Sequence, residues 1–186
     1  INTCSVTAVS DKKSRQMIRR AKKRNPAAII AACGCYVQTH TDEAKSLGID
    51  LIGGTGQRME FLHQLLAAAE ERQTRVLVDD ALRRHDFEIL PAGGQHSRTR
   101  AMLKVEDGCR NFCTYCIIPF ARGPVRSLPL EEAARQTEQL ARQGYREVVL
   151  TGIEISSWGQ DLPGEESLID LLEAVSAAAG AMRVRL

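Results

Sequence analysis

Three cysteines at short spacing are the most reactive feature of this sequence. Cys109, Cys113 and Cys116 are separated by three and by two residues, and they follow a run that predicts a β-strand. Three thiolates on one short loop can face a common centre, which suits an iron–sulfur cluster or a zinc ion. A structural zinc site needs a fourth ligand, and no Cys or His follows Cys116 in the chain. The pattern therefore favours a cluster that keeps one coordination position open for chemistry.

Three further cysteines, Cys4, Cys33 and Cys35, lie near the start of the chain. Cys4 and Cys35 each follow a segment that predicts a strand, and the carboxyl ends of parallel strands meet at one edge of a sheet. We therefore expect these two side chains at the same edge. Disulfide pairing of the six cysteines is the alternative. Clustered cysteines beside glycines and aromatic residues in a helix-rich chain are more typical of metal or redox chemistry.

The first 26 residues form a strongly basic block. Eight Lys and Arg residues against the single acidic residue Asp11 give this block a net charge of +7, although the whole chain carries only +2. A local block of this kind can bind phosphates even in a nearly neutral protein. A solvated helix face is the simpler interpretation for a generic helix. The block gains interest because it follows Cys4 by only a few residues.

The composition of the 186 residues is that of a globular protein, with 44% hydrophobic and 26% charged residues. It excludes a disordered tail and a collagen-like repeat, and no run of ~18 apolar residues suggests a membrane span. Aromatic residues make up only 4%, so we expect a core of Leu, Ile, Val and Ala. No signal peptide is visible. We expect a cytoplasmic protein with no membrane partner.

Alternating strands and helices predict an α/β fold with parallel strands. The expected strands cover residues 1–3, 28–32, 49–52, 101–105, 147–150 and 182–186. The expected helices cover residues 11–24, 41–47, 57–72, 130–143 and 167–179. The first helix would have Ser10 or Asp11 as its N-cap and would stop at Asn25-Pro26. Residues 73–97 break the rhythm and predict a connection between two domains.

The spacing Cys-x3-Cys-x-aromatic-Cys, with Tyr115 before the last cysteine, resembles the cluster motif of the radical S-adenosylmethionine enzymes. The resemblance implies that Cys109, Cys113 and Cys116 hold a [4Fe–4S] cluster whose fourth iron binds the methionine part of S-adenosylmethionine. Tyr115 would lie against the adenine. Reductive cleavage of this cofactor would then give a 5′-deoxyadenosyl radical.

Longer matches resemble the methylthiotransferase family within that superfamily. The matching segments are Ile1–Thr7, Gly34–Gln38, Arg98–Cys109 and Cys113–Ser127. The implied architecture is an N-terminal open parallel α/β sheet domain followed by the first part of a (β/α) partial TIM barrel. The implied bounds are 1–72 for the first domain, 73–97 for the connection and 98–186 for the radical core.

The ends of the chain indicate a fragment. The chain starts at Ile1 without a Met and stops at a strand-like segment that ends at Leu186. By the resemblance, it would lack the start of the first domain, the rest of the barrel and a C-terminal domain that binds RNA. We expect such a fragment to be inactive alone.

In this family, three N-terminal cysteines hold a second [4Fe–4S] cluster that is implicated in sulfur delivery. Cys4 matches the Asn-Thr-Cys motif and Cys35 the Gly-Cys-x-x-Gln motif, and the third ligand would lie upstream of residue 1. Cys33 has no counterpart in the family pattern. We expect it to point into the core as a small buried thiol. Its substitution for the missing ligand is the alternative.

The resemblance implies a transferase that inserts a methylthio group at C2 of N6-threonylcarbamoyladenosine beside the tRNA anticodon. The segments Ser10–Arg20, Arg122–Ser127 and Val149–Ile153 favour this branch of the family. Glu154 and Trp158 depart from its pattern, where a histidine and a tyrosine are usual. The alternatives are the branches that modify isopentenyladenosine in tRNA or an aspartate of a ribosomal protein. An alternative of another class is a non-catalytic iron–sulfur protein that binds RNA.

The implied cofactors are two [4Fe–4S] clusters and S-adenosyl-L-methionine. Gly152, which follows the second barrel strand, would contact the methionine part, and a plain turn is the other interpretation of this glycine. The implied partners are the tRNA anticodon stem-loop and an electron donor such as flavodoxin or ferredoxin. The candidate ligands of RNA phosphates are Lys12, Lys13, Arg19, Arg20, Arg122 and Arg126.

Overall fold

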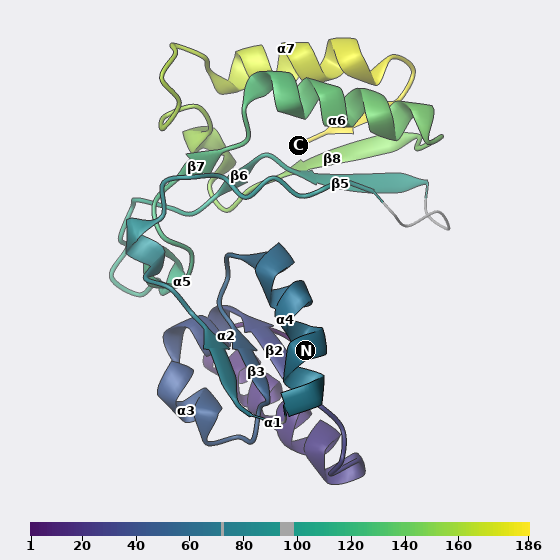
Figure 1. Cartoon of the computed structure of the whole chain (residues 1–186). Helices are drawn as coiled ribbons and strands as arrows, with labels where there is room; N and C mark the ends of the chain where they lie inside the picture. Colours follow the sequence, from purple (N-terminus) through teal and green to yellow (C-terminus); the bar gives the residue numbers. More distant parts are fainter. Residues whose placement is uncertain (72, 94–98) are drawn as a thin grey trace. The chain divides into compact units, whose positions relative to one another are not determined.

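The computed structural model describes residues 1–71, 73–93 and 99–186, which form two compact units. Each unit takes two stretches of the chain, 1–84 with 111–123 and 85–110 with 124–186. Parallel strands and covering helices build both units (Figure 1), which confirms the expected α/β class. Arg98, the expected start of the radical core, lies outside the described residues.

The first unit contains a sheet of four parallel strands. In spatial order they are β1 (Asn2–Thr3), β2 (Ala31–Gly34), β3 (Leu51–Gly53) and β4 (Arg75–Leu77). The register pairs Thr3 with Gly34 and Gly53 with Leu77, so the carboxyl ends of neighbouring strands reach one edge. Strand β4 comes from the segment that was expected to be only a connection. Its three residues are too short a run to show strand periodicity in the sequence.

Helices pack around this sheet. They are α1 (Ala8–Arg24), α2 (Cys35–Thr39), α3 (Thr41–Lys45), α4 (Arg58–Glu71), the 3-10 turn η1 (Ala81–Arg83) and α5 (Ile118–Arg122). Helix α1 is capped by Thr7, whose hydroxyl accepts the N–H of Ser10, so the expected N-cap at Ser10 or Asp11 is wrong. The helix ends before Asn25 and Pro26, as expected.

The core of the first unit fixes α2 against the sheet. The buried side chains of this core are Ile18, Ile30, Ala32, Tyr36, Val37, Ala44, Ile49 and Ile52. Each large apolar side chain contributes ~1.5–3 kcal/mol when it is fully removed from water. Tyr36 and Val37 belong to α2, so this five-residue helix is held by burial rather than by its length. Cys35, at its first turn, is therefore held in place too.

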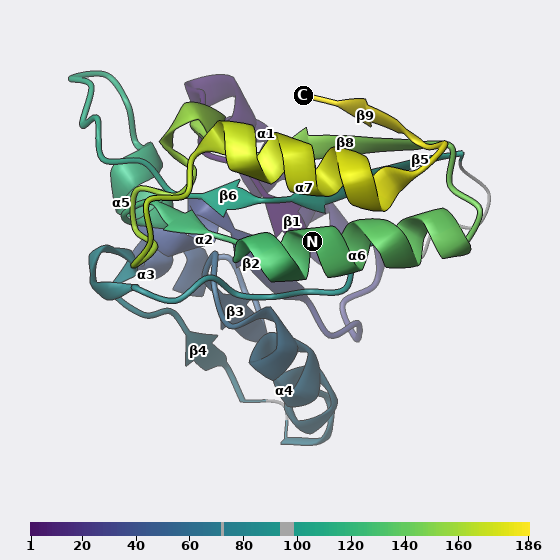
Figure 2. The same ribbon diagram turned by 90° about the horizontal axis from the view of Figure 1, so that it is seen from above.

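The second unit contains three parallel strands with two helices on one face. The strands, in spatial order, are β5 (Arg100–Lys104), β8 (Glu147–Thr151) and β9 (Arg183–Arg185). Helices α6 (Leu130–Arg142) and α7 (Leu168–Ala179) lie side by side over them (Figure 2). The remaining elements are the antiparallel pair β6 (Glu106–Asp107) and β7 (Arg126–Ser127), and the 3-10 turn η2 (Ile155–Ser157).

Alternate residues of β5 and β8 point into the core between sheet and helices. This core includes Leu103, Val105, Leu140, Val148, Leu150, Leu171 and Val175. Helix α7 starts with a capping box formed by Ser167 and Asp170. Both helices stop before glycines with positive φ, Gly144 and Gly180, as expected. In the parts of the chain that the structure describes, no helix is long and apolar enough to cross a membrane.

Candidate metal centre

Cys4 and Cys35 follow paired residues at the carboxyl edge of the first sheet. Strands β1 and β2 pair Thr3 with Gly34, so each cysteine is the next residue along its chain segment. Gly34 has a φ of 107°, and a Cβ atom there would lie 2.4 Å from the carbonyl oxygen of Thr3. Glycine therefore permits the close approach of the two segments. Cys4 is exposed and Cys35 is buried, and both stand at the edge that the strand pattern predicted.

Cys33 lies two residues before Cys35 and pairs with Asn2 in the register. Alternation along β2 places its side chain on the face opposite to Ala32, which belongs to the core. Cys33 is half-buried, so the expectation of a thiol buried in the core is wrong. Burial raises the pKa of this thiol, while the N-terminal ammonium group and Arg58 oppose the rise.

The other three cysteines lie on the loop between β6 and α5. Gly108, with a φ of 92°, and Phe112, with a φ of 45°, have left-handed backbone conformations that bend this loop. The N–H of Cys116 donates to the carbonyl oxygen of Cys113 at 2.9 Å, which closes a turn between these two ligand candidates. Cys113 is exposed, and Cys109 and Cys116 are half-buried. Cys109 belongs to the second unit, whereas Cys113 and Cys116 belong to the first.

The donor chemistry of these cysteines fits iron–sulfur clusters. All six are free thiols. Across residues 1–71, 73–93 and 99–186, no three side chains of His, Cys, Asp or Glu converge in an arrangement that could hold a metal ion. Thiolates are nevertheless the ligands that iron–sulfur clusters take, and three free thiols stand on one accessible loop. The residues present therefore suit a cluster at this loop.

Glu106 organises the loop that follows β8, and sequence reasoning missed it. Its Oε2 accepts the N–H groups of Ile153 and Glu154 at 2.6 and 2.9 Å. The side chain is fully buried, and its Oε1 has no hydrogen-bond partner among the described residues. Burial raises the pKa of this carboxyl, while the two N–H groups oppose the rise. The one signal in the sequence is an acidic residue between a strand and the cysteine loop.

Gly152 and Tyr115 were expected to contact the cofactor. A Cβ atom at Gly152 would lie 2.6 Å from Oε2 of Glu106, so a close contact within the second unit already requires this glycine. Tyr115 lies on the cysteine loop, and its side chain is 91% exposed. An exposed aromatic ring beside thiol ligands is available to stack on a base.

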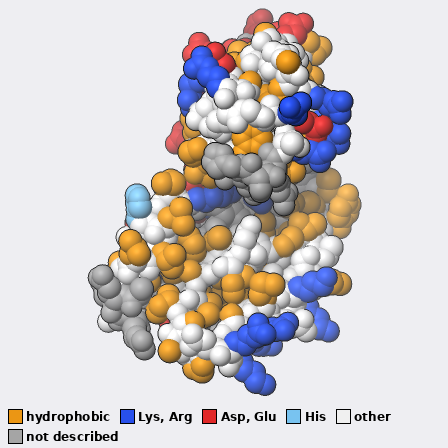
Figure 3. Space-filling view, turned by 90° about the vertical axis from the view of Figure 1, so that its right-hand side faces the viewer, with side chains coloured by type: hydrophobic (Ala, Val, Ile, Leu, Met, Phe, Trp, Pro, Cys, Tyr) orange, Lys and Arg blue, Asp and Glu red, His pale blue; other side chains and the backbone are white. Residues whose placement is uncertain are grey.

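Most basic residues of α1 are accessible. Lys12, Lys13, Arg19 and Arg20 are all exposed. Ile18, fully buried, fixes the orientation of this helix toward the core. Figure 3 shows Lys and Arg side chains gathered along one side of the first unit. This surface can therefore meet a polyanion from solvent.

Arg122 and Arg126 are less exposed to solvent than the four basic side chains of α1 named above. Arg122 is half-buried at the end of α5. Arg126 is only 4% exposed, and its Nη1 donates to the carbonyl oxygen of Pro124 at 2.8 Å. Its Nη2 lies 3.7 Å from Oδ2 of Asp107. Because Arg126 is buried and engaged within its own unit, it is not available to bind a phosphate from solvent.

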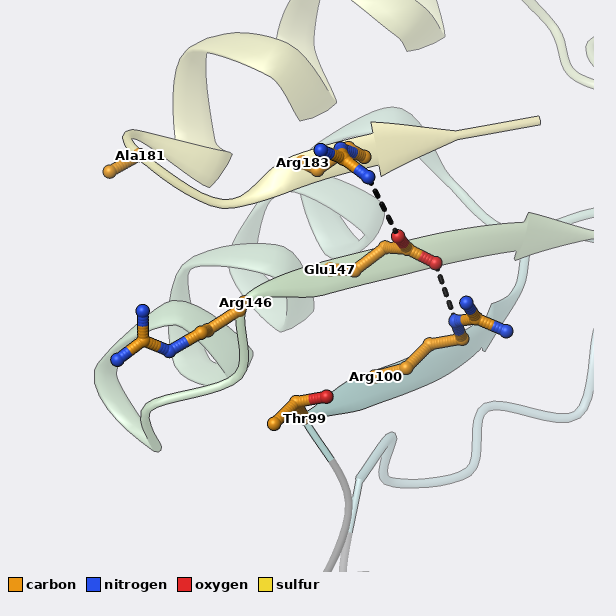
Figure 4. A pocket seen from close by; sticks show the side chains of 6 residues that line it. All are labelled: Thr99, Arg100, Arg146, Glu147, Ala181 and Arg183. Atoms are coloured by element: carbon orange, nitrogen blue, oxygen red, sulfur yellow. Dashed lines mark ion pairs between the residues drawn. The ribbon is translucent and has the colours of Figure 1, made fainter.

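A pocket of about 340 Å³ opens at the amino ends of the strands in the second unit (Figure 4). Glu147 of β8 lies between Arg100 of β5, at 2.5 Å, and Arg183 of β9, at 3.7 Å. Arg185 lies 3.5 Å from the same carboxylate. Cys109 comes after the carboxyl end of β5, which lies at the opposite end of the sheet. The charged cluster in this pocket therefore joins three strands at the far end from that cysteine.

Two family models match the chain. Residues 1–54 match the model described as "Uncharacterized protein family UPF0004", and residues 103–183 match the radical SAM superfamily. The first match includes Cys4 and Cys35. The second begins in β5 and includes all three cysteines of the loop. Both cysteine groups therefore lie within matched segments.

Several curated proteins are similar along nearly the whole chain. The threonylcarbamoyladenosine tRNA methylthiotransferase MtaB of Bacillus subtilis is 42% identical and covers 100% of this chain. The protein of the same name from Aquifex aeolicus is 43% identical and covers 87% of the chain. The tRNA-2-methylthio-N(6)-dimethylallyladenosine synthase of Clostridium tetani is 34% identical over 99% of the chain. This chain spans 42%, 40% and 42% of the length of these three relatives, respectively.

Proposed function

We propose that this chain, a member of the radical S-adenosylmethionine methylthiotransferase family, carries the cluster-binding part of a tRNA-modifying enzyme. The reaction adds a methylthio group to C2 of N6-threonylcarbamoyladenosine beside the anticodon. The observation that carries the proposal is the second cysteine pair, Cys4 and Cys35, which follows paired residues at one sheet edge. Two proteins named MtaB are 42% and 43% identical to this chain, and this similarity supports the choice of substrate.

The cysteine loop holds the radical-forming cofactors in this proposal. S-adenosylmethionine bound to a reduced [4Fe–4S] cluster supplies a 5′-deoxyadenosyl radical, which removes hydrogen from an unreactive C–H bond. Cys109, Cys113 and Cys116 are the ligands of that cluster. The exposed ring of Tyr115, on the same loop, packs against the adenine.

The loop after β8 receives the methionine part of the cofactor. Gly152 presents bare backbone there, and Glu106 holds the next two N–H groups in place. Ordered backbone at this position supports catalysis by alignment of the reactants.

Cys4 and Cys35 bind a second [4Fe–4S] cluster that delivers the sulfur. Cys4 is exposed, so a group held there is reachable from solvent. The cysteines stand at a carboxyl edge of parallel strands, which is where α/β sheets place their ligands. Cys33, on the neighbouring position of β2, is left outside this ligand set.

The tRNA anticodon stem-loop is the macromolecular partner. Lys12, Lys13, Arg19 and Arg20 contact its phosphates, and Arg122 adds a contact beside the cysteine loop. Flavodoxin or ferredoxin supplies the electrons, in the cytoplasm. In this proposal the first domain ends at residue 72 and the radical core starts at residue 98.

Mass spectrometry of tRNA nucleosides from a deletion strain tests the substrate. We expect loss of the methylthio group from N6-threonylcarbamoyladenosine, with its recovery when the gene is returned. Loss from isopentenyladenosine, or from a ribosomal aspartate, would instead assign another branch of the family. A second assay measures 5′-deoxyadenosine from S-adenosylmethionine and dithionite in the reconstituted full-length protein. Its absence would favour a non-catalytic iron–sulfur protein.

A further inference from the structure

Two segments that carry cysteines meet within the first unit. Helix α2 starts at Cys35 and carries Gln38. Helix α5 starts two residues after Cys116, and it packs against α2. The two helices are far apart in the chain, so a tertiary contact must hold them together.

A largely buried arginine provides that contact. The side chain of Arg84 is 11% exposed. Its Nη2 donates to Oε1 of Gln38 at 2.9 Å, and its Nη1 donates to Oγ1 of Thr55 at 2.6 Å. The hydroxyl of Thr55 in turn donates to the carbonyl oxygen of Ala121, in α5, at 2.6 Å. Asp79 balances the charge, since its Oδ2 accepts from Nε of Arg84 at 2.8 Å. A continuous chain of hydrogen bonds thus joins α2 to α5.

The glycine-rich turn after β3 is shaped around this chain of hydrogen bonds. A Cβ atom at Gly54 would lie 2.1 Å from Oε1 of Gln38, and one at Gly56 would lie 3.1 Å from Cζ of Arg84. The N–H of Thr55, between the two glycines, also donates to Oε1 of Gln38 at 3.0 Å. The glycines therefore make room for two polar side chains. A network with every partner satisfied rigidifies its surroundings.

We propose that Arg84 and Thr55 are positioning residues that fix the segment of Cys35 relative to the segment of Cys113 and Cys116. The inference rests on the proposed function insofar as both segments bind clusters. Neither residue touches substrate. Their effect matters for catalysis because a misplacement of ~1 Å in aligned reactants can reduce a rate by about 10²-fold.

Thr55→Val tests the link, because valine keeps the shape of threonine and removes the hydroxyl. Thr137→Val is the matched control: Thr137 is fully buried, and its hydroxyl donates to the carbonyl oxygen of Ala133 at 2.8 Å within α6 of the other unit. In the metal-free full-length protein, we expect Thr55→Val to speed amide hydrogen exchange in α2 and α5 by about tenfold. Thr137→Val should leave exchange in these two helices unchanged, and Thr55→Ser should restore wild-type exchange.

A second measurement uses the cluster-loaded protein. In Thr55→Val, the ratio of 5′-deoxyadenosine to methylthio nucleoside should rise about tenfold at unchanged iron content, since radical formation continues while transfer is misaligned. Arg84→Lys should also raise this ratio, because lysine lacks the planar guanidinium group that donates to two acceptors at once. It also serves as the test if Thr55→Val does not fold.

Two results separate this inference from the proposed function. Unchanged exchange and an unchanged product ratio in both variants would overturn the positioning role and leave the proposed function intact. A wild-type protein that makes no methylthio nucleoside would overturn the proposed function. Faster exchange in Thr55→Val would still support the link between the two helices in that case.

Discussion

At the scale of single residues, close contacts explain two glycines beside the candidate sites. Gly34 lets β2 approach Thr3 at the edge that carries Cys4 and Cys35, and Gly152 makes room for Glu106. Both contacts join residues that are distant in the chain. The sequence marks such positions only as glycines at strand ends, and the partner that requires each glycine appears only in the fold.

Gly34→Ala should destabilise the first unit by about 3 kcal/mol or more, because it adds a backbone clash to the strain of a positive φ. Gly48→Ala is the matched control, since Gly48 has a φ of 70° and no atom lies within 4 Å of the added Cβ. Strain alone should reduce its stability by only ~1 kcal/mol. Urea denaturation of both variants measures the two free energies of unfolding. Equal losses would contradict the role given to the approach of β1 and β2.

The buried carboxyl of Glu106 predicts a pH dependence of stability. Burial raises its pKa, so the folded protein holds this proton more tightly than the unfolded chain does. This group's contribution to stability is therefore greatest at low pH and is lost as the pH rises through the raised pKa. Glu106→Gln cannot ionise, yet its amide oxygen still accepts both N–H groups. The melting temperature of the variant minus that of the wild type should increase from about pH 4 to about pH 8.

Glu173→Gln, on the exposed side of α7, is the control for the loss of one carboxylate. Its melting temperature should follow that of the wild type across the same range. A constant difference between Glu106→Gln and the wild type would show that folding does not raise the pKa of Glu106.

At the scale of secondary structure, the length of each helix decided whether the sequence could predict it. The long amphipathic helices were found almost to the residue: α6 was expected at 130–143 and covers Leu130–Arg142. Helices α2 and α5 were missed, because five residues make little more than one turn and show no periodicity. They are formed by tertiary packing, and they are the elements that carry or adjoin the cysteines. The short helices that position the candidate site were therefore the least predictable elements of the fold.

Helix α1 carries the prediction about RNA. Reversing four of its exposed cations, Lys12, Lys13, Arg19 and Arg20, should raise the Kd for tRNA. The slope of log Kd against log salt should fall by up to about 4, near one unit for each lost phosphate contact. Filter binding by the full-length protein over a salt series measures both quantities.

The control for this experiment reverses Arg135 and Arg142, which are exposed on α6 in the second unit. This double variant removes surface charge without touching α1, so the salt slope should stay at its wild-type value. An equal loss of slope per reversed charge in both variants would show that net charge, rather than the surface of α1, governs binding.

At the scale of the whole molecule, the alternation of strands and helices predicted the α/β class, whereas the structure builds each compact unit from two stretches of the chain. Residues 111–123 belong to the first compact unit, although they come after the segment 73–97 that was expected to connect the domains. The packing of α5 against α2 and η1 decides this. Such packing depends on contacts that single motifs do not encode. Cys35, Cys113 and Cys116 thereby share one unit.

The two clusters of the proposed function predict two separate losses of iron in the reconstituted full-length protein. Cys116→Ser should remove about four irons per chain and abolish formation of 5′-deoxyadenosine, because it breaks the radical SAM trio. Cys35→Ser should also remove about four irons. This variant should still form 5′-deoxyadenosine and should lose only the methylthio product. Cys33→Ser, two residues away and outside the proposed ligand sets, should retain the full iron content. Iron analysis, Mössbauer spectroscopy and the two product assays distinguish these variants.

The matched pair Cys33→Ser and Cys35→Ser decides between the two interpretations of the N-terminal cysteines. Cys35 starts α2 at the sheet edge beside Cys4, whereas Cys33 lies within β2 with its side chain on the face opposite to Ala32. If Cys33 replaced a cluster ligand, its serine variant would lose as much iron as Cys35→Ser. If no second cluster existed, both variants would keep wild-type iron. Loss confined to Cys35→Ser is the outcome that the strand register predicts, since only Cys4 and Cys35 leave paired strands at the same edge.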